Sequence, residues 1–342
     1  MIRPSTRLLS AAALIALLVP VFQAAAQQHV PPAPDSAGPQ APAAQPEPSA
    51  PAPSAPLVFP PPNPADFTAA SPTKEVVNAF LNANFGWDDN RIWQVQKILK
   101  TQVDGISQVI VLEGDKSDKS GKPQIQALSF FVLPDGKHII VGDQIIDFGP
   151  HPFAEAREKL QSSADGPYRG SASKNLELVE FADFQCPHCK EAQANMDKLV
   201  TDFPNARIVF QVWPIAQIHP EAVRAAEYGV CVTKLGGSSA FFQFAAAVFD
   251  GQDGLATGDG ATLTLNSAVT KAGLDPAKVA ACATTPEAKA QVDASVKLGS
   301  EVGVTQTPLL AINGRLVPPN APYEVLKKII DFQIKQDGVA GQ

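Results

Sequence analysis

Apolar and polar residues define two regions of regular periodicity, one before and one after about residue 150. In the first, four apolar residues between 76 and 81 recur at helical spacing. This predicts an amphipathic helix over 72–84, with Ser71 as its N-cap and Pro72 at its first position. Alternating stretches then predict strands near 91–100, 106–113, 124–133 and 138–148. One helix and an antiparallel sheet make a small α+β domain over 71–150.

The second region has the pattern of an α/β domain over 173–338. It is preceded by a connection over 151–172, formed by a helix to about 162 and a loop. Residues 176–182 are apolar on both faces, as expected of a central strand. A helix and a strand at 208–213 follow and complete a β-α-β unit. After a long helical stretch over 219–303, three elements close the domain: a strand at 309–312, a turn at Asn313-Gly314 and a helix at 322–335.

The first 26 residues have the organisation of a cleavable signal peptide. Arg3 and Arg7 make the start positive, an apolar stretch covers 8–22, and the alanines at 24–26 offer a cleavage site. An uncleaved membrane anchor is the alternative, but the apolar stretch is short for a spanning helix. We expect a periplasmic or other extracytoplasmic location, where disulfides persist.

Residues 27–70 are rich in proline and alanine. Fifteen of the 32 prolines of the chain lie between 27 and 72. Such a segment has too little apolar surface to pack, so we expect a disordered linker. A proline-rich segment that binds a partner protein is the alternative.

The charge balance gives no support to a nucleic-acid-binding function. The chain has 27 Lys and Arg against 34 Asp and Glu, which gives a formal net charge of -7. Proteins that bind nucleic acid normally show a basic face that neutralises phosphates. We therefore expect no nucleic-acid partner.

Two of the four cysteines form the motif Cys186-Pro187-His188-Cys189 between a predicted strand and a predicted helix. At a helix start, free N–H groups and the helix dipole stabilise a thiolate, so Cys186 is the expected nucleophile. Pro187 suits the first helical position, and His188 adds a hydrogen-bond donor beside the thiolate. Cys189 lies one turn further on and resolves the mixed disulfide. This pattern favours a redox dithiol.

Half of a zinc site is the alternative interpretation of Cys-x-x-Cys. The remaining cysteines, Cys231 and Cys282, lie 51 residues apart and do not form a second pair with ligand spacing. In an exported chain we expect them to form a structural disulfide, and a second redox pair that exchanges electrons with Cys186 is the alternative. We expect no metal and no cofactor beyond the redox-active disulfide Cys186–Cys189.

Glu180 is a candidate for proton transfer. It shares a strand face with Leu176 and Leu178, so we expect it to be buried. Burial raises the pKa of a carboxyl group and would let Glu180 exchange a proton with Cys189. A solvent-exposed glutamate on an edge strand is the alternative. Asp183 is expected to serve as a turn or cap residue.

Two segments, 181–189 (FADFQCPHC) and 303–308 (GVTQTP), resemble the DsbA-type thiol:disulfide oxidoreductases of the thioredoxin superfamily. The resemblance covers 173–338 and implies a thioredoxin fold with a helical insertion at about 216–303. It implies that Cys186 attacks and Cys189 resolves, and that Glu180 is the buried acid of the family. It further implies a cis bond and a substrate-binding loop, formed by Gln306, Thr307 and Pro308.

Two features resemble the DsbC/DsbG isomerases instead. Thr307 precedes the proline as it does in those proteins. Residues 133–142 (LPDGKHIIVG) resemble a hairpin of their dimerisation domain. This second resemblance implies that the domain over 71–150 forms a homodimer.

We expect an enzyme that donates the Cys186–Cys189 disulfide to exported proteins with free or mispaired cysteines. A membrane redox partner would reoxidise it. One alternative is a dimeric isomerase or reductase of the DsbC/DsbG type. The other is a chaperone-like binder, without enzymatic activity, whose dithiol is incidental.

Overall fold

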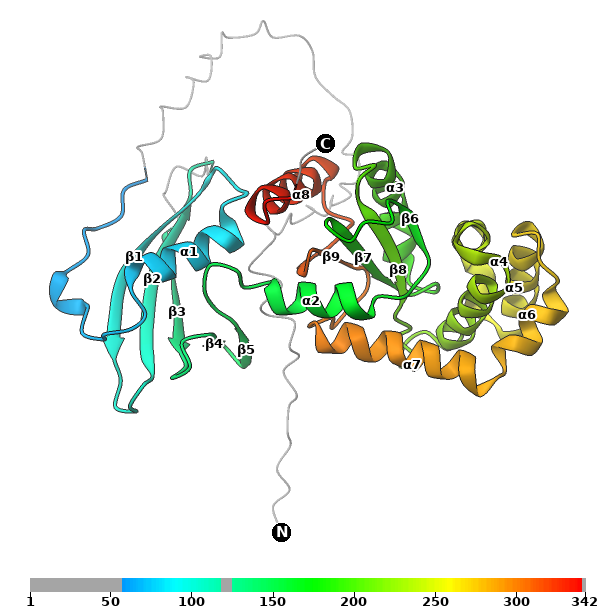
Figure 1. Cartoon of the computed structure of the whole chain (residues 1–342), viewed down its shortest axis with the longest axis horizontal. Helices are drawn as coiled ribbons and strands as arrows, with labels where there is room; N and C mark the ends of the chain where they lie inside the picture. Colours follow the sequence, from blue (N-terminus) through cyan, green and yellow to red (C-terminus); the bar gives the residue numbers. More distant parts are fainter. Residues whose placement is uncertain (1–56, 118–124, 340–342) are drawn as a thin grey trace, which may run out of the picture. The chain divides into compact units, whose positions relative to one another are not determined.

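The computed structural model describes residues 57–117 and 125–339, so the expected signal peptide and most of the expected linker lie outside the described residues. The described chain forms two compact units (Figure 1). The first unit comprises residues up to 78 and 89–148, and the second comprises 79–88 and 149 onward. Among the described residues, no helix combines the length and apolar character needed to cross a bilayer.

The first unit contains a five-stranded antiparallel sheet in which each strand pairs with the next along the chain. Its strands are β1 (Arg91–Lys100), β2 (Ser107–Asp115), β3 (Ile125–Val132), β4 (His138–Val141) and β5 (Gln144–Asp147). One face of the sheet is buried through Val109, Val111, Phe130 and Ile139, because side chains alternate between the two faces of a strand. The mixed α/β class and the antiparallel sheet agree with the sequence-based prediction.

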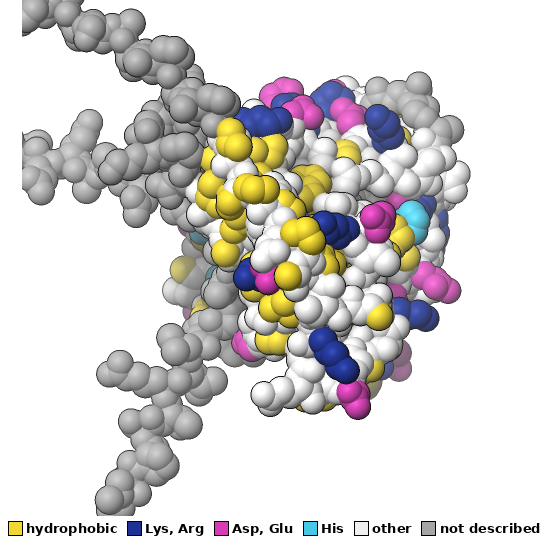
Figure 2. All heavy atoms as spheres, turned by 90° about the vertical axis from the view of Figure 1, so that its left-hand side faces the viewer, with side chains coloured by type: hydrophobic (Ala, Val, Ile, Leu, Met, Phe, Trp, Pro, Cys, Tyr) yellow, Lys and Arg dark blue, Asp and Glu magenta, His cyan; other side chains and the backbone are white. Residues whose placement is uncertain are grey.

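Two expectations for the first unit were wrong. The single strand predicted over 138–148 is a hairpin, because Gly142 adopts a positive φ of 61° and turns β4 into β5. The expected linker is ordered from residue 57. The N–H groups of Thr68 and Ala69 donate to the Ile98 carbonyl, and a short helix, η2 (Pro64–Asp66), precedes them. The side of the first unit that lies on the left in Figure 1 presents several apolar side chains among scattered charges (Figure 2).

Helix α1 (Lys74–Phe85) starts later than its predicted first position. The Ser71-Pro72 bond is cis, and the Thr73 hydroxyl accepts a hydrogen bond from the N–H of Val76, so Thr73 takes the capping role expected of Ser71.

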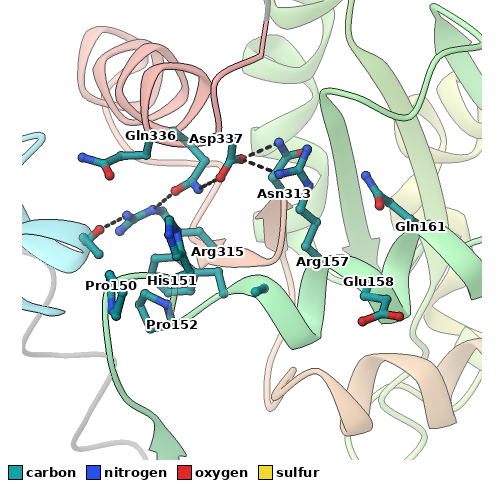
Figure 3. A pocket seen from close by; sticks show the side chains of 14 residues that line it. Pro150, His151, Pro152, Arg157, Glu158, Gln161, Asn313, Arg315, Gln336 and Asp337 are labelled. Carbon is teal, nitrogen blue, oxygen red and sulfur yellow. Dashed lines mark hydrogen bonds and ion pairs between the residues drawn. The ribbon is translucent and has the colours of Figure 1, made fainter. Parts of the chain in front are cut away.

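The end of α1 belongs to the second unit, although we expected the whole helix in the first. The guanidinium of Arg315 donates to the carbonyl oxygens of Ala83 and, over 3.0 Å, Asn84 (Figure 3). Its Nε donates to Gln333 over 2.9 Å. Gln333 in turn donates to the carboxylate of Asp337 over 3.0 Å. The two bonds from Arg315 to Ala83 and Asn84 satisfy carbonyl groups that the last turn of a helix leaves unpaired.

The second unit is built on a five-stranded mixed sheet with β7 at its centre. The strand order is β10 (Arg315–Val317), β9 (Leu309–Ile312), β7 (Glu177–Ala182), β8 (Arg207–Val212) and β6 (Tyr168–Gly170). β7 runs parallel to β8 and antiparallel to β9, and all six of its residues are buried. The sequence predicts a loop at the short β6, because Gly166, Pro167 and Gly170 are typical loop residues.

Helices cover both faces of this sheet. On one face, Leu178 packs in a cluster with residues of α3 (Pro187–Asp202) and α8 (Tyr323–Gln336). On the other face, Val179 and Phe181 pack in a cluster with residues of α2 (Ala154–Ser163) and α7 (Pro286–Glu301). The central strand is therefore held rigidly from both sides, which fixes the position of the residues that follow it.

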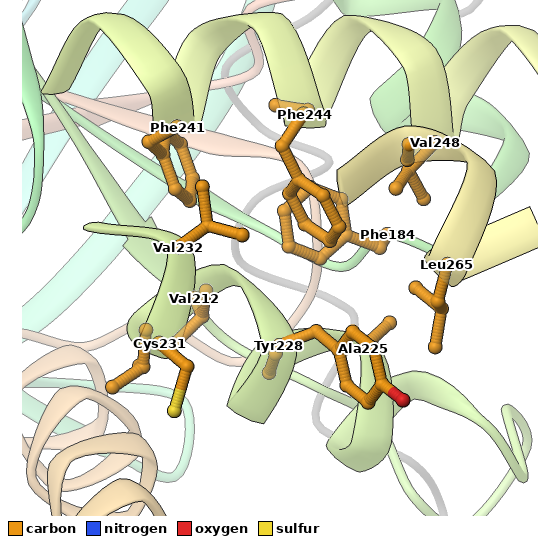
Figure 4. Packing of buried hydrophobic residues seen from close by; sticks show 14 of the residues in the cluster. Phe184, Val212, Ala225, Tyr228, Cys231, Val232, Phe241, Phe244, Val248 and Leu265 are labelled. Carbon is orange, nitrogen blue, oxygen red and sulfur yellow. The ribbon is translucent and has the colours of Figure 1, made fainter. Parts of the chain in front are cut away.

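A helical insertion lies between β8 and β9. It comprises α4 (Ala222–Asp250), η3 (Gln252–Ala256), α5 (Gly258–Lys271), α6 (Pro276–Ala283) and α7. α4 is kinked at Gly237, which has a φ of 74°. Phe184, from the turn after β7, packs into the core of the insertion, with ring centroids 5.4 Å from Phe210 and 5.6 Å from Phe244 (Figure 4).

Candidate active site

The Cys-x-x-Cys motif lies where the buried central strand ends and α3 begins. β7 ends at Ala182, and the N–H of Cys186 donates to the Asp183 carbonyl over 3.1 Å, which closes a turn. Cys186 is the N-cap residue of α3, and Pro187 occupies its first turn. Cys186 is 5% exposed and Cys189 is fully buried, and both are free thiols. One thiol is thus partly accessible and the other is shielded by it.

The two thiols have opposite acidities. Hydrogen bonding from the Cys189 thiol lowers the pKa of Cys186 to about 5, with further help from the N–H groups of Cys189 and His188 and against the effect of burial. Burial and the neighbouring Cys186 raise the pKa of Cys189 far above its ordinary value. The Cys189 thiol and the N–H groups at the helix start therefore favour the thiolate form of Cys186, whereas burial favours the protonated form of Cys189.

The loop before β9 lies against the sulfur of Cys186. The Cys186 Sγ is 3.7 Å from the Thr307 carbonyl oxygen, although the residues are 121 positions apart. The Thr307-Pro308 bond is cis. Pro308 is buried and Gln306 is exposed, so the loop presents backbone and the Gln306 side chain to solvent beside the dithiol.

Glu180 is buried in the sheet, with 2% of its surface exposed. Burial raises the pKa of its carboxyl to about 7, although a hydrogen bond from Gln193 opposes the shift. The Gln193 amide donates to Glu180 Oε1 over 2.8 Å and to the Cys189 carbonyl over 3.1 Å. Gln193 was not identified from the sequence. Its position four residues after Cys189, on the same face of α3, was the available signal.

Asp183 does more than form the expected turn. Its carboxylate accepts from the N–H of Gln185 over 2.8 Å, as a turn residue would. It also accepts from the N–H of Ile215 over 2.8 Å and lies 2.7 Å from Nδ1 of His219. The side chain is fully buried, so these bonds replace the water that a carboxylate needs. His219 lies in a loop outside any recognisable motif, so the amino-acid sequence gave no sign of this role.

The His188 side chain is largely exposed. Its ring Nδ1 lies 3.0 Å from the Glu191 carboxylate, and both side chains are 64% exposed. The hydrogen bond with Glu191 raises the pKa of the imidazole. The backbone N–H of His188 favours the Cys186 thiolate, and the charge of Cys186 contributes to the raised pKa of the imidazole.

Cys231 in α4 and Cys282 in α6 are joined by a disulfide, with Cα atoms 5.9 Å apart. It crosslinks two helices of the insertion. Since these cysteines are bonded to each other, neither is available as a zinc ligand for the Cys186–Cys189 pair.

Comparison with known proteins places this geometry in a family. The family model described as thioredoxin matches residues 162–332, which is half of the chain. The chain belongs to the thioredoxin family. The match covers β7, α3, the insertion and the cis-proline loop of the second unit, which we now call the thioredoxin domain.

Curated relatives match only over short stretches. A Na(+)/H(+) antiporter NhaA 1 of Salinispora arenicola is 41% identical over 59 residues, 17% of this chain and 9% of that protein. A Na(+)/H(+) antiporter NhaA 3 of Salinispora tropica is 32% identical over 91 residues, 27% of this chain and 14% of that protein. The chain therefore covers a small part of the length of these relatives.

Solved structures resemble the chain over about half its length. A thioredoxin-like oxidoreductase from Silicibacter pomeroyi is 26% identical with a TM-score of 0.45, covering 52% of this chain and 98% of that one. The thiol-disulfide exchange protein alpha-DsbA2 from Wolbachia pipientis is 22% identical with a TM-score of 0.44, covering 52% and 95%. BdbD from Bacillus subtilis is 20% identical with a TM-score of 0.42, covering 51% and 93%.

Proposed function

We propose that this protein is a thiol:disulfide oxidoreductase that donates the Cys186–Cys189 disulfide to other proteins. The observation that carries the proposal is the pairing of a partly accessible thiol, Cys186, whose pKa is lowered to about 5, with a shielded one. A thiolate stabilised in the reduced form makes the disulfide form a stronger oxidant, because reduction is then favoured. The low pKa of Cys186 therefore favours a protein that donates its disulfide to substrates over one whose dithiol reduces the disulfides of substrates.

The proposed reaction has two exchange steps. A substrate thiolate attacks Sγ of Cys186 in the disulfide, the bond to Cys189 breaks, and Cys189 leaves with the electron pair and takes up a proton. A second substrate thiolate then attacks the substrate sulfur of this mixed disulfide and releases Cys186 as a thiolate. The substrate loses two electrons and gains a disulfide, while the enzyme gains a dithiol.

Glu180 is the proposed proton donor to Cys189. Its pKa of about 7 means that both protonation states are populated at neutral pH, as proton transfer requires. Gln193 joins the two through hydrogen bonds to the Glu180 carboxylate and the Cys189 carbonyl. Substrate backbone would pair beside Thr307 and Gln306, next to the attacked sulfur.

Trapping of the mixed disulfide tests this proposal. The Cys189→Ser variant, activated at Cys186 as a mixed disulfide with a small thiol, should exchange that thiol for a reduced peptide and hold it as a covalent adduct. A reducing agent should release the adduct. The Cys186→Ser variant, with Cys189 intact, should form none. Equal adduct formation by both variants would contradict the proposed roles.

We further propose that the protein works outside the cytosol on exported proteins and that a membrane redox partner reoxidises it. The Cys231–Cys282 disulfide supports an oxidising compartment, because thiols are kept reduced in the cytosol. Recovery of the processed chain in the periplasmic fraction of an expressing cell, with its N-terminus after residue 26, would support this. A cytosolic, unprocessed chain would contradict it.

A dimeric isomerase or reductase is the second candidate, and one observation favours it. Phe131, Ile140 and Ile145 are aligned directly opposite one another across β3, β4 and β5. Phe131 is 39% and Ile145 63% exposed, so the outer face of this sheet offers an apolar stripe to a second copy. Light scattering should then show a dimer that Ile145→Lys dissociates, together with rescue of scrambled disulfides. A monomeric wild-type protein would remove this candidate.

A further inference from the structure

Two glutamine side chains connect the helical insertion to the turn that carries Cys186. Gln252, in η3, is 8% exposed, and its amide donates to the carbonyl oxygens of Phe184 over 2.9 Å and Cys186 over 3.0 Å. Gln185 makes the reciprocal connection. Its amide donates to the Leu255 carbonyl over 3.0 Å and accepts from the N–H of Glu221 over 2.9 Å. The Gln252 bonds and the Gln185–Leu255 bond join residues 66 to 70 positions apart, and the Gln185–Glu221 bond joins residues 36 positions apart.

The element that carries Gln252 is tightly packed. A Cβ on Gly254 would collide with the Thr264 hydroxyl, and one on Gly260 would collide with the Gly254 carbonyl. Leu255 is fully buried. Glycine at these two positions lets η3 and α5 approach closely. This close packing fixes the position of η3, and therefore of Gln252.

We propose that Gln252 is a positioning residue through which the insertion fixes the backbone of Cys186 and thereby orients its thiolate. Its two acceptors, the carbonyls of Phe184 and Cys186, lie on either side of Gln185, and Cys186 is the N-cap residue of α3. Cys186 is held at φ -77° and ψ 120°, a non-helical conformation that the first turn of α3 does not itself impose.

The Cys186 carbonyl is shared between the insertion and α3. It accepts from Gln252 and also from the N–H groups of Cys189 over 3.1 Å and Lys190 over 3.3 Å. The N–H groups of His188 and Cys189 are among the groups that favour the Cys186 thiolate, together with the Cys189 thiol and the Thr307 side chain. If Gln252 releases the carbonyl, the N-cap residue can rotate and the sulfur moves out of line with these donors. A merely structural glutamine would affect unfolding and leave the thiolate unchanged.

The test compares Gln252→Met with Gln243→Met. Methionine keeps the volume of glutamine but donates no hydrogen bond, and Gln243 is an exposed glutamine on α4. Thiolate absorbance at 240 nm across pH measures the pKa of Cys186 in the reduced protein, and near-UV circular dichroism verifies the native fold. A second variant, Gln252→Glu, places a negative acceptor against the two carbonyls and is measured in the same way.

We expect Gln252→Met to raise the pKa of Cys186 by roughly half to one unit, the size of one lost hydrogen bond, and Gln252→Glu to raise it further. The equilibrium with glutathione should shift about threefold to tenfold toward the enzyme disulfide. Gln243→Met should match the wild type. A folded Gln252→Met or Gln252→Glu protein with the wild-type pKa would overturn the inference. The inference rests on the proposed function for its importance, but this titration needs no substrate. An altered pKa in a protein without exchange activity would refute the function alone.

Discussion

The backbone N–H of Asp183 donates to Sγ of the resolving Cys189 over 3.4 Å. The carboxylate of the same residue is held by His219 and by the N–H of Ile215. The loop after β8 therefore fixes the residue that contacts the buried sulfur. With Gln252 on the other side of the turn, both cysteines of the motif are positioned by segments outside the β-α unit that contains them.

Removal of His219 should destabilise the thioredoxin domain. His219→Ala leaves the buried Asp183 carboxylate without one hydrogen-bond partner, which costs about 1–3 kcal/mol. Urea unfolding of the reduced protein measures the effect. His151→Ala, at an exposed histidine of the same unit, is the control and should lie within about 0.5 kcal/mol of wild type. Equal free energies of unfolding for both variants would show that the Asp183–His219 contact contributes nothing.

Alkylation of Cys186 should persist in acid. Only the thiolate reacts, and the pKa of Cys186 is lowered to about 5, so the rate should stay constant from pH 8 to 6 and fall by half near pH 5. Iodoacetamide labelling of the reduced protein, read by mass spectrometry, measures it. Cys189 should remain unlabelled throughout, because burial raises its pKa and shields it. A rate that declines steadily from pH 8.5 downward would mean that the helix start does not stabilise the thiolate.

The charge of Glu180 should reduce stability at high pH. The folded carboxyl keeps its proton up to about pH 7, whereas the ordinary value is 4.5, so the free energy of unfolding falls as pH rises between these values. Glu180→Gln removes this loss and should be more stable than wild type at pH 8 by about 3 kcal/mol, relative to their difference at pH 4. Denaturant unfolding at the two pH values measures it. Glu158→Gln, at an exposed site, is the control and should show the same pH dependence of the free energy of unfolding as the wild type. If Glu180→Gln also showed the wild-type pH dependence, the pKa of Glu180 would not be raised in the folded protein.

Loss of the Cys231–Cys282 disulfide should destabilise the protein but spare the dithiol. The double variant Cys231→Ala/Cys282→Ala opens a crosslink between positions 51 residues apart, worth about 4 kcal/mol in the chain-entropy model. Thermal unfolding should reflect this, while Cys186 and Cys189 should still form and release a disulfide reversibly. Loss of reversible oxidation in a folded double variant would favour the alternative that Cys231 and Cys282 exchange electrons with Cys186.

The sequence predicted those parts of the fold that local patterns determine. β7 was recognised because apolar residues fall on both of its faces, and the start of α3 because Pro187 suits a first helical turn. β6 and the order in residues 57–70 were missed, because both depend on pairing with distant strands rather than on their own composition.

The same distinction applies to the candidate site. The motif and Glu180 could be identified from residue type and spacing, and the Thr307-Pro308 loop from the resemblance to the DsbA-type proteins. His219 and Gln252 could not, since each acts through a contact that only the folded chain creates, and the sequence signal for Gln193 was its position one helical turn after Cys189. Polar residues that hold a backbone in place carry no motif of their own, and a glutamine in a helical stretch has the same appearance whether it is exposed or buried.

A redox titration of the Cys186–Cys189 pair in glutathione buffers tests the central claim most directly. We predict a reduction potential less negative than about -180 mV, because the low pKa of Cys186 stabilises the reduced form and makes the disulfide a donor. A potential at or below about -220 mV, near the cytosolic glutathione couple, would contradict donation and identify the pair as a reductant.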